Sequence, residues 1–187
     1  MDPIDNLARA FDVAHGVIAK VRPDQWSSQS PCTEWDARAV GNHLMGGALM
    51  VSSGVAGKEM DMSTLGGDLL GDNPAATYRK AADDAIAAFR ADPSVLGRPV
   101  KMPFGEMPGA MVAGLFTADH FTHAWDLAKA TAQDTNLDPE LAAGVLAATR
   151  QMISADMRRP GRFGPEVPAG AGASAADQVA AFLGRQP

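Results

Sequence analysis

Asp119 and His123 are the residues in this sequence whose types and spacing most clearly allow chemistry. They lie in the stretch Met111–Thr131, which has no proline and whose length suits a helix better than a strand. Residues four apart on a helix have Cβ atoms roughly 5–6 Å from each other, so the two side chains point the same way. Apolar residues such as Val112 and Leu127 share their face, which is therefore expected to point into the core.

A carboxylate and an imidazole on an inward helix face allow two interpretations. An ionised carboxylate is seldom buried without a partner, because its burial costs several kcal/mol or more. The pair is therefore half of a metal site that needs a further ligand, or it is an Asp–His hydrogen bond that only holds helices together. The stretch around Asp119 and His123 does not decide between them.

His43 is the candidate for the missing ligand. It lies on a second predicted helix, which opens at Cys32–Asp36 and continues to about Met50. Thr33 and the aspartate three residues later are spaced as in a capping box, with Asp in place of the usual Glu or Gln.

Two adjacent glycines, Gly46 and Gly47, lie on the same helix face as His43. Each costs roughly 1 kcal/mol of helix stability relative to alanine. This cost is explained if a ligand or a close helix approaches His43, and the sequence leaves both explanations open.

Two further histidines are secondary candidates. His15 lies on the inward stripe of a predicted helix Pro3–Val21, where it is either satisfied by a hydrogen bond or in contact with the functional pocket. His120 follows Asp119 directly but is rotated from it by about 100° around the helix. It replaces the carboxylate as a ligand only if the helix is turned, and the apolar periodicity favours Asp119.

Cys32 and Asp126 could support such a site. Cys32 precedes a predicted helix start, where the helix dipole can lower a thiol pKa and produce a nucleophile. A packing role at the start of the helix is the favoured interpretation. Asp126 lies three residues after His123 and either orients its imidazole or makes a solvent-facing cap or salt bridge.

The elements that must position these residues are mostly helical. Two extended or irregular regions interrupt them, a long loop Val51–Asn73 and a short segment around Val100 and Met102. The other predicted helices are Pro74–Arg90, Glu140–Met157 and Ser174–Leu183. The expected architecture is a single all-α domain over residues 1–187, with a four-helix bundle and extra C-terminal helices. Metal sites in bundles are built from facing helices, which makes His43 the expected partner of the pair on Met111–Thr131.

Composition excludes several functions. The 187 residues carry a formal charge of −6 and contain no run of Lys or Arg, which argues against a nucleic-acid partner. The single cysteine excludes an intrachain disulfide. The N-terminal residues lack the features of a signal peptide, and no apolar stretch is long enough to span a membrane. These features predict a cytoplasmic protein that does not bind membranes.

Two motifs resemble a known family. The first is Ser30–Trp35 (SPCTEW) followed by His43, and the second is His123–Ala128 (HAWDLA). Together they resemble the mycothiol-dependent maleylpyruvate isomerase N-terminal domain, within the wider DinB-like, or YfiT-like, group of metal-binding four-helix bundles. Pro103–Gly109 and the tail Phe182–Arg185 are similar to actinobacterial members of that group.

The resemblance implies that His43, Asp119 and His123 hold a divalent metal, most simply Zn²⁺, with Ni²⁺, Fe²⁺ or Mn²⁺ as alternatives. The isomerase commonly has Glu where this chain has Asp119, which is shorter by one methylene. The isomerase also carries an additional C-terminal domain that contributes to its substrate site, whereas this chain ends soon after the bundle. The isomerase reaction itself therefore does not carry over.

Three protein ligands leave an open position on a tetrahedral ion, as in catalytic zinc sites. A coordinated thiol is essentially deprotonated, and the family theme is activation of a low-molecular-weight thiol, mycothiol, for attack on a small electrophile. The same ligands suit a hydrolase. A non-catalytic metal- or ligand-binding bundle is the other function class. The expected partners are thus a small thiol and an electrophile, and a homodimer is left open.

Overall fold

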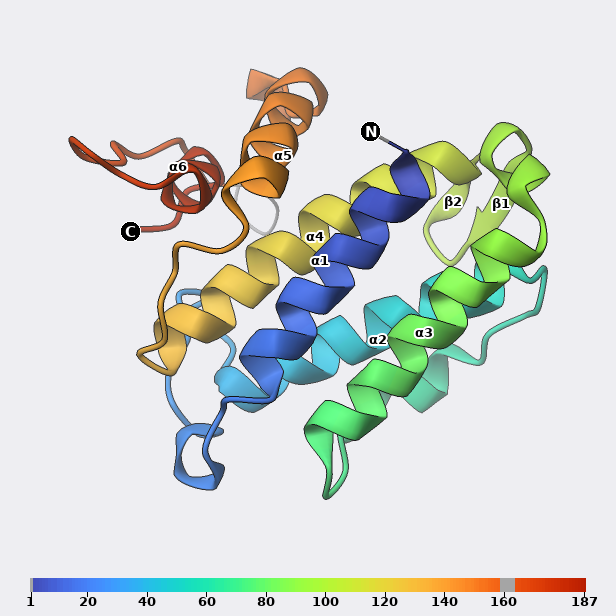
Figure 1. Ribbon diagram of the computed structural model, residues 1–187, viewed down its shortest axis with the longest axis horizontal. Helices are drawn as coiled ribbons and strands as arrows, with labels where there is room; N and C mark the ends of the chain where they lie inside the picture. The colour runs from blue at the N-terminus through green and yellow to red at the C-terminus, as the bar shows by residue number, and fades with distance from the viewer. Residues whose placement is uncertain (1, 159–163) are drawn as a thin grey trace.

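The computed structural model describes residues 2–158 and 164–187 and shows an all-α fold with one two-stranded antiparallel sheet. Helices α1 to α4 form a four-helix bundle, and α5 and α6 lie together on the side of α4 (Figure 1). This arrangement confirms the predicted bundle with additional C-terminal helices. The α-helices are α1 Pro3–Ile18, α2 Ala37–Val55, α3 Pro74–Ala91, α4 Gly109–Ala130, α5 Pro139–Met152 and α6 Ala175–Phe182.

Local capping explains where several helices begin. The Asp2 carboxylate accepts a hydrogen bond from the Ile4 backbone N–H at 2.8 Å, and proline occupies the next position of α1. Asn73 caps α3 in the same way, and Ser174 caps α6. These three starts agree with the sequence-based boundaries.

The start of α2 differs from the prediction. Asp36 is itself the N-cap, and its carboxylate accepts the Ala39 backbone N–H at 2.8 Å. Thr33 therefore lies before the helix and does not form the predicted capping box with Asp36. The helix also continues to Val55, five residues beyond the expected end, so that the long loop is shorter than predicted and contains a short 3-10 helix, Met62–Gly66.

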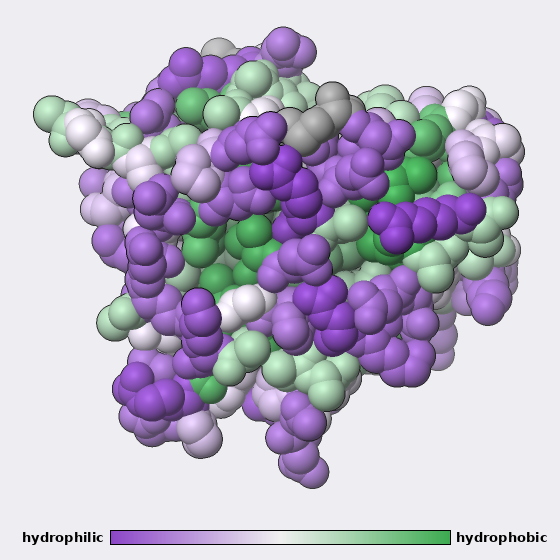
Figure 2. Space-filling model, viewed as in Figure 1, coloured by the Kyte–Doolittle hydropathy of each residue, from purple (hydrophilic) through white to green (hydrophobic). Residues whose placement is uncertain are grey.

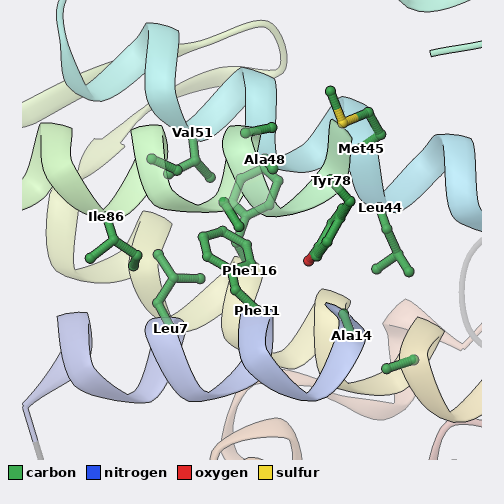
Figure 3. Packing of buried hydrophobic residues seen from close by; sticks show 14 of the residues in the cluster. Leu7, Phe11, Ala14, Leu44, Met45, Ala48, Val51, Tyr78, Ile86 and Phe116 are labelled. Carbon is green, nitrogen blue, oxygen red and sulfur yellow. The ribbon is translucent and has the colours of Figure 1, made fainter. Parts of the chain in front are cut away.

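The bundle core is built from one apolar face of each of its four helices. Side chains from α1, α2, α3 and α4 point toward one another there, with Phe11 and Tyr78 packed edge to face at 6.4 Å between ring centroids (Figure 3). The face of α3 that packs into this core carries Tyr78, Ala82, Ala85, Ile86 and Phe89, all of them buried.

A hairpin closes one end of the bundle. Strand β1, Pro99–Met102, pairs with β2, Gly105–Pro108, and the side chains of Val100 and Met102 face the core. The first strand is the predicted extended segment. The second was not predicted, because Gly105–Pro108 was interpreted as the approach to the following helix.

The C-terminal part packs around Trp125 of α4. Its indole N–H donates a hydrogen bond to Asp177 of α6 at 2.8 Å, and both helices contribute to a second apolar cluster. Helix α5 ends at Met152, earlier than predicted, because Ile153 already has an extended backbone; a 3-10 helix, Ala155–Met157, follows. The Pro- and Gly-rich composition of the following segment, 158–172, predicts a surface loop, and its residues 159–163 lie outside the described part.

The surface is largely polar. Figure 2 shows hydrophilic residues over most of one face, with hydrophobic residues visible between them. Ion pairs such as Arg79 with Asp12, at 2.8 Å, link α3 to α1. Within residues 2–158 and 164–187, no helix combines the length and apolarity that a membrane span requires.

Candidate metal centre

The three side chains proposed from the sequence converge between α2 and α4. His43 on α2 places Nε2 at 3.1 Å from Oδ1 of Asp119, and Nε2 of His123 lies 3.8 Å from the same oxygen. One ligand atom from each of the three residues falls within 4.8 Å of the other two. The bundle therefore brings together residues that are 76 positions apart in the chain.

The cluster lies at the edge of the core and not inside it. The side chains of His43, Asp119 and His123 are 31, 25 and 12 % exposed, so a small molecule has access to them. One oxygen of the group has no such access: Oδ2 of Asp119 is buried and accepts no hydrogen bond among the described residues, although Nδ1 of His120 lies 3.6 Å away. A buried carboxylate oxygen without a hydrogen bond is uncommon and is consistent with a missing ligand or ion.

The spacing of the donor atoms suits a metal ion. Ligand atoms bound about 2.0–2.1 Å from tetrahedral zinc lie about 3.4 Å from one another. The two distances to Oδ1 of Asp119, 3.1 and 3.8 Å, lie on either side of that value. Two imidazoles and a carboxylate are also a recognised zinc ligand set that leaves a position open. The residues present therefore fit a divalent cation.

The electrostatics keep the carboxylate ionised. Burial raises the pKa of Asp119, but the hydrogen bond from His43 and the nearby charges of His123 and His43 outweigh it and hold the pKa below its ordinary value. Burial lowers the pKa of His43, whereas the hydrogen bond and charge of Asp119 raise it, with a net upward shift. Asp119 is therefore ionised, and the imidazoles of His43 and His123 must be deprotonated before they can bind a cation.

Asp126 lies beneath His123 and is fully buried, which contradicts the alternative of a solvent-facing cap. Its Oδ2 is 2.9 Å from Nδ1 of His123, although the two groups are not aligned as a regular hydrogen bond. Burial raises the pKa of Asp126, but contacts with His123 and Arg185 lower it to about 2. A carboxylate at Nδ1 leaves Nε2 free to face the cluster, as outer carboxylates do for metal-bound histidines.

A tight turn before α2 brings Trp35 and Cys32 to the site. The Ser30 hydroxyl accepts a hydrogen bond from the Cys32 backbone N–H at 3.1 Å and donates one to the Trp35 carbonyl at 2.7 Å. The Trp35 ring then lies 4.9 Å from His43 and 5.5 Å from His123 between centroids. This places Trp35 as a wall of the site.

Cys32 is not an activated thiol. Its Sγ donates a hydrogen bond to Asp126 at 3.3 Å, and burial followed by the charge of Asp126 raises its pKa to about 12. It also precedes α2 by several residues, so the helix dipole does not act on it directly. Cys32, His123 and Asp126 form a second group of donor atoms within 4.8 Å, but the Arg185 guanidinium already supplies the cation there.

We therefore expect Cys32 to react slowly with iodoacetamide. At pH 8 a thiol with a pKa of about 12 has on the order of 10³ times less thiolate than an ordinary cysteine. The check is the rate of alkylation followed by mass spectrometry, with the urea-unfolded protein as the reference. Equal rates in the folded and unfolded protein would contradict the assignment.

His120 and His15 lie outside the cluster. His120 is fully buried on the neighbouring side of α4, with Nδ1 3.0 Å from the Phe116 carbonyl oxygen and Nε2 3.0 Å from that of Leu44. Burial lowers its pKa to about 4. It does not take the ligand position, as the periodicity predicted. His15 is half-buried, and burial, followed by the charge of Arg79 on α3, lowers its pKa.

The glycines of α2 serve helix contact. A Cβ at Gly47 would lie 2.7 Å from Cε1 of His120, and one at Gly46 would touch Leu65 and Leu69 at 3.5 and 3.7 Å. The close approach therefore comes from α4 and from the Met62–Leu70 region, and not from a ligand of His43. This result favours the helix-packing explanation of the two glycines.

Arg185 is the site residue that sequence reasoning missed. It donates to both oxygens of Asp126, from Nε at 3.1 Å and from Nη2 at 2.9 Å. The one signal in the sequence was the Phe182–Arg185 tail, which resembled the family but suggested no role.

Comparison with known proteins identifies the family of the chain. The family model for the mycothiol maleylpyruvate isomerase N-terminal domain matches residues 7–128. Two curated relatives in Mycobacterium tuberculosis, uncharacterized protein MT0763 (strain CDC 1551 / Oshkosh) and uncharacterized protein Rv0738 (strain ATCC 25618 / H37Rv), are each 40 % identical over 186 residues, which is 99 % of this chain and 98 % of theirs. No solved structure matches the chain. The chain belongs to the mycothiol maleylpyruvate isomerase N-terminal domain family.

Proposed function

We propose that this protein is a divalent-metal-dependent enzyme that activates a low-molecular-weight thiol, mycothiol, for transfer to a small electrophile or for its isomerisation. His43, Asp119 and His123 hold the metal, with Zn²⁺ as the first choice and Ni²⁺, Fe²⁺ or Mn²⁺ as alternatives. The observation that carries the proposal is the metal-ligand spacing of the donor atoms of His43, Asp119 and His123. The buried Oδ2 of Asp119, which accepts no hydrogen bond among the described residues, supports it.

Each residue of the site has a part in this function. When bound, the ion supplies Lewis acidity that lowers the pKa of a thiol at its open position. Asp119 provides the negative charge, and His43 and His123 provide neutral nitrogen ligands. Trp35 covers both imidazoles and excludes water from that side. The partial exposure of His43 and Asp119 leaves the opposite side open for the thiol and the electrophile.

Metal removal tests the proposal. The protein is purified without chelator, its metal content is measured, and mycothiol conjugation to a panel of electrophiles is followed before and after treatment with EDTA. We expect close to one divalent ion per chain, loss of conjugation with EDTA, and recovery on addition of Zn²⁺. Conjugation that survives complete metal removal would rule out this mechanism.

The same experiment separates the alternatives. Bound metal without turnover of any electrophile supports a non-catalytic metal-binding bundle. Metal-dependent turnover that needs no thiol supports a hydrolase, because the same ligand set can activate water. Conjugation that requires both the metal and the thiol supports the proposed transferase or isomerase.

A further inference from the structure

Arg185 reaches the candidate site from the C-terminal segment. Its guanidinium donates two hydrogen bonds to the Asp126 carboxylate, at 3.1 and 2.9 Å, in the fork geometry that arginine and carboxylate favour. The Arg185 side chain is 15 % exposed and that of Asp126 is fully buried. The pair is therefore held inside the protein, where geometry and charge matter more than at the surface.

The end of α6 aims Arg185 at this point. Gly184 has a φ of +87°, and the Arg185 backbone N–H donates to the Ala180 carbonyl at 2.9 Å, while that of Gly184 donates to Ala181 at 3.0 Å. These bonds form a Schellman turn, which reverses the chain after the helix. The turn directs the Arg185 side chain back toward α4 and away from solvent.

Asp126 depends on Arg185 as its countercharge. Besides the guanidinium, the carboxylate meets the Cys32 thiol at 3.3 Å and Nδ1 of His123 at 2.9 Å. Without Arg185, a fully buried carboxylate would keep a neutral thiol and one imidazole as partners. It would then lose the two hydrogen bonds that fix its orientation, and with them the position of Oδ2 opposite Nδ1 of His123, which keeps Nε2 free.

We infer that Arg185 is a positioning residue of the candidate metal centre: it fixes the Asp126 carboxylate, which in turn fixes the ring and tautomer of His123. The inference extends the site beyond residues 7–128, the part that the family model matches. Its consequence for metal affinity rests on the proposed function. Its consequence for His123 does not.

The test compares two arginines that hold the same segment. Arg185→Gln removes the countercharge, and Arg185→Lys keeps the charge but loses the fork. The matched control is Arg158→Gln, because Arg158 donates to the Phe182 carbonyl at 2.8 Å and so anchors the end of α6, whereas Asp126 is not among its hydrogen-bond partners in the described residues. Thermal unfolding of the metal-free proteins shows that each variant folds.

Two readouts report on the site. Zn²⁺ affinity is measured by competition with a chelating dye, and the d–d absorption of the Co²⁺-loaded protein reports the ligand geometry. We expect Arg185→Gln to bind Zn²⁺ about 10–100-fold more weakly and to shift the Co²⁺ bands, because outer partners of metal-bound histidines have effects of this size. Arg185→Lys should be intermediate, and Arg158→Gln should match the wild type.

The second readout needs no metal. Long-range ¹H–¹⁵N spectra of the metal-free protein should show His123 as the Nδ1–H tautomer in the wild type and as a mixture in Arg185→Gln. If the wild type binds no Zn²⁺, the proposed function fails and this spectrum alone decides the inference. An unchanged tautomer in Arg185→Gln, or an equal loss of affinity in Arg158→Gln, would overturn it.

Discussion

His43→Ala is expected to lower Zn²⁺ affinity by at least about 100-fold, because loss of a ligand should exceed the roughly 10–100-fold effect of losing an outer partner. The substitution removes the nitrogen that lies 3.1 Å from Asp119 and is the sole ligand from α2 in the cluster. Asp119 and His123 would remain as a pair on one helix. The measurement is competition with a chelating dye, together with metal content after purification.

His15→Ala is the matched control for this variant. It deletes the same side chain from a half-buried position on α1, in an environment dominated by burial and by Arg79, Asp12 and Asp83. We expect it to keep wild-type metal affinity. If His43→Ala retains full affinity, or if both variants lose it equally, the ligand assignment of His43 is wrong.

Gly47→Ala is expected to destabilise the bundle by up to about 2 kcal/mol. The new methyl would lie 2.7 Å from Cε1 of His120 and 3.3 Å from Cε1 of Phe116. His120 has little room to move, since both of its ring nitrogens lie 3.0 Å from backbone carbonyl oxygens. Overpacking of this kind costs about 1–3 kcal/mol, which outweighs the roughly 1 kcal/mol gained in helix propensity.

Gly114→Ala on α4 separates packing from propensity. Gly114 is exposed, and an added Cβ would have no neighbour within 4 Å, so we expect this variant to be more stable by about 0.5–1 kcal/mol. Urea unfolding of both variants gives the comparison. A Gly47→Ala protein as stable as the wild type would show that His120 can move to make room for the added methyl, and so that α2 and α4 are not tightly packed at this point.

The sequence predicted the structure correctly where interactions between residues close together in the chain determine it. The predicted starts of α1, α3 and α6 lie at the observed starts or one residue before them, where a capping residue or a proline opens each helix. Spacing of four residues also placed Asp119 and His123 together. The bundle architecture then indicated His43, which the structure brings within hydrogen-bonding distance of Asp119.

The predictions failed or were incomplete where contacts outside the local sequence pattern determine the structure. Thr33 has the right spacing for a cap, but hydrogen bonds between Ser30, Cys32 and Trp35 keep this segment in a turn, so that the helix starts after Asp36. The residue pattern of α2 also does not indicate which element packs against Gly47. Arg185 was missed because its partner is 59 residues away in the chain, and no local pattern connects them.

Trp35 has a consequence for how the site can be studied. Its indole lies against both imidazoles of the cluster, whereas Trp125 packs with α6 and Trp26 lies near Arg38. Paramagnetic ions quench indole emission only at short range. The protein therefore carries an intrinsic fluorescent reporter of site occupancy, and titrations with Co²⁺ or Ni²⁺ can be followed without attaching a dye.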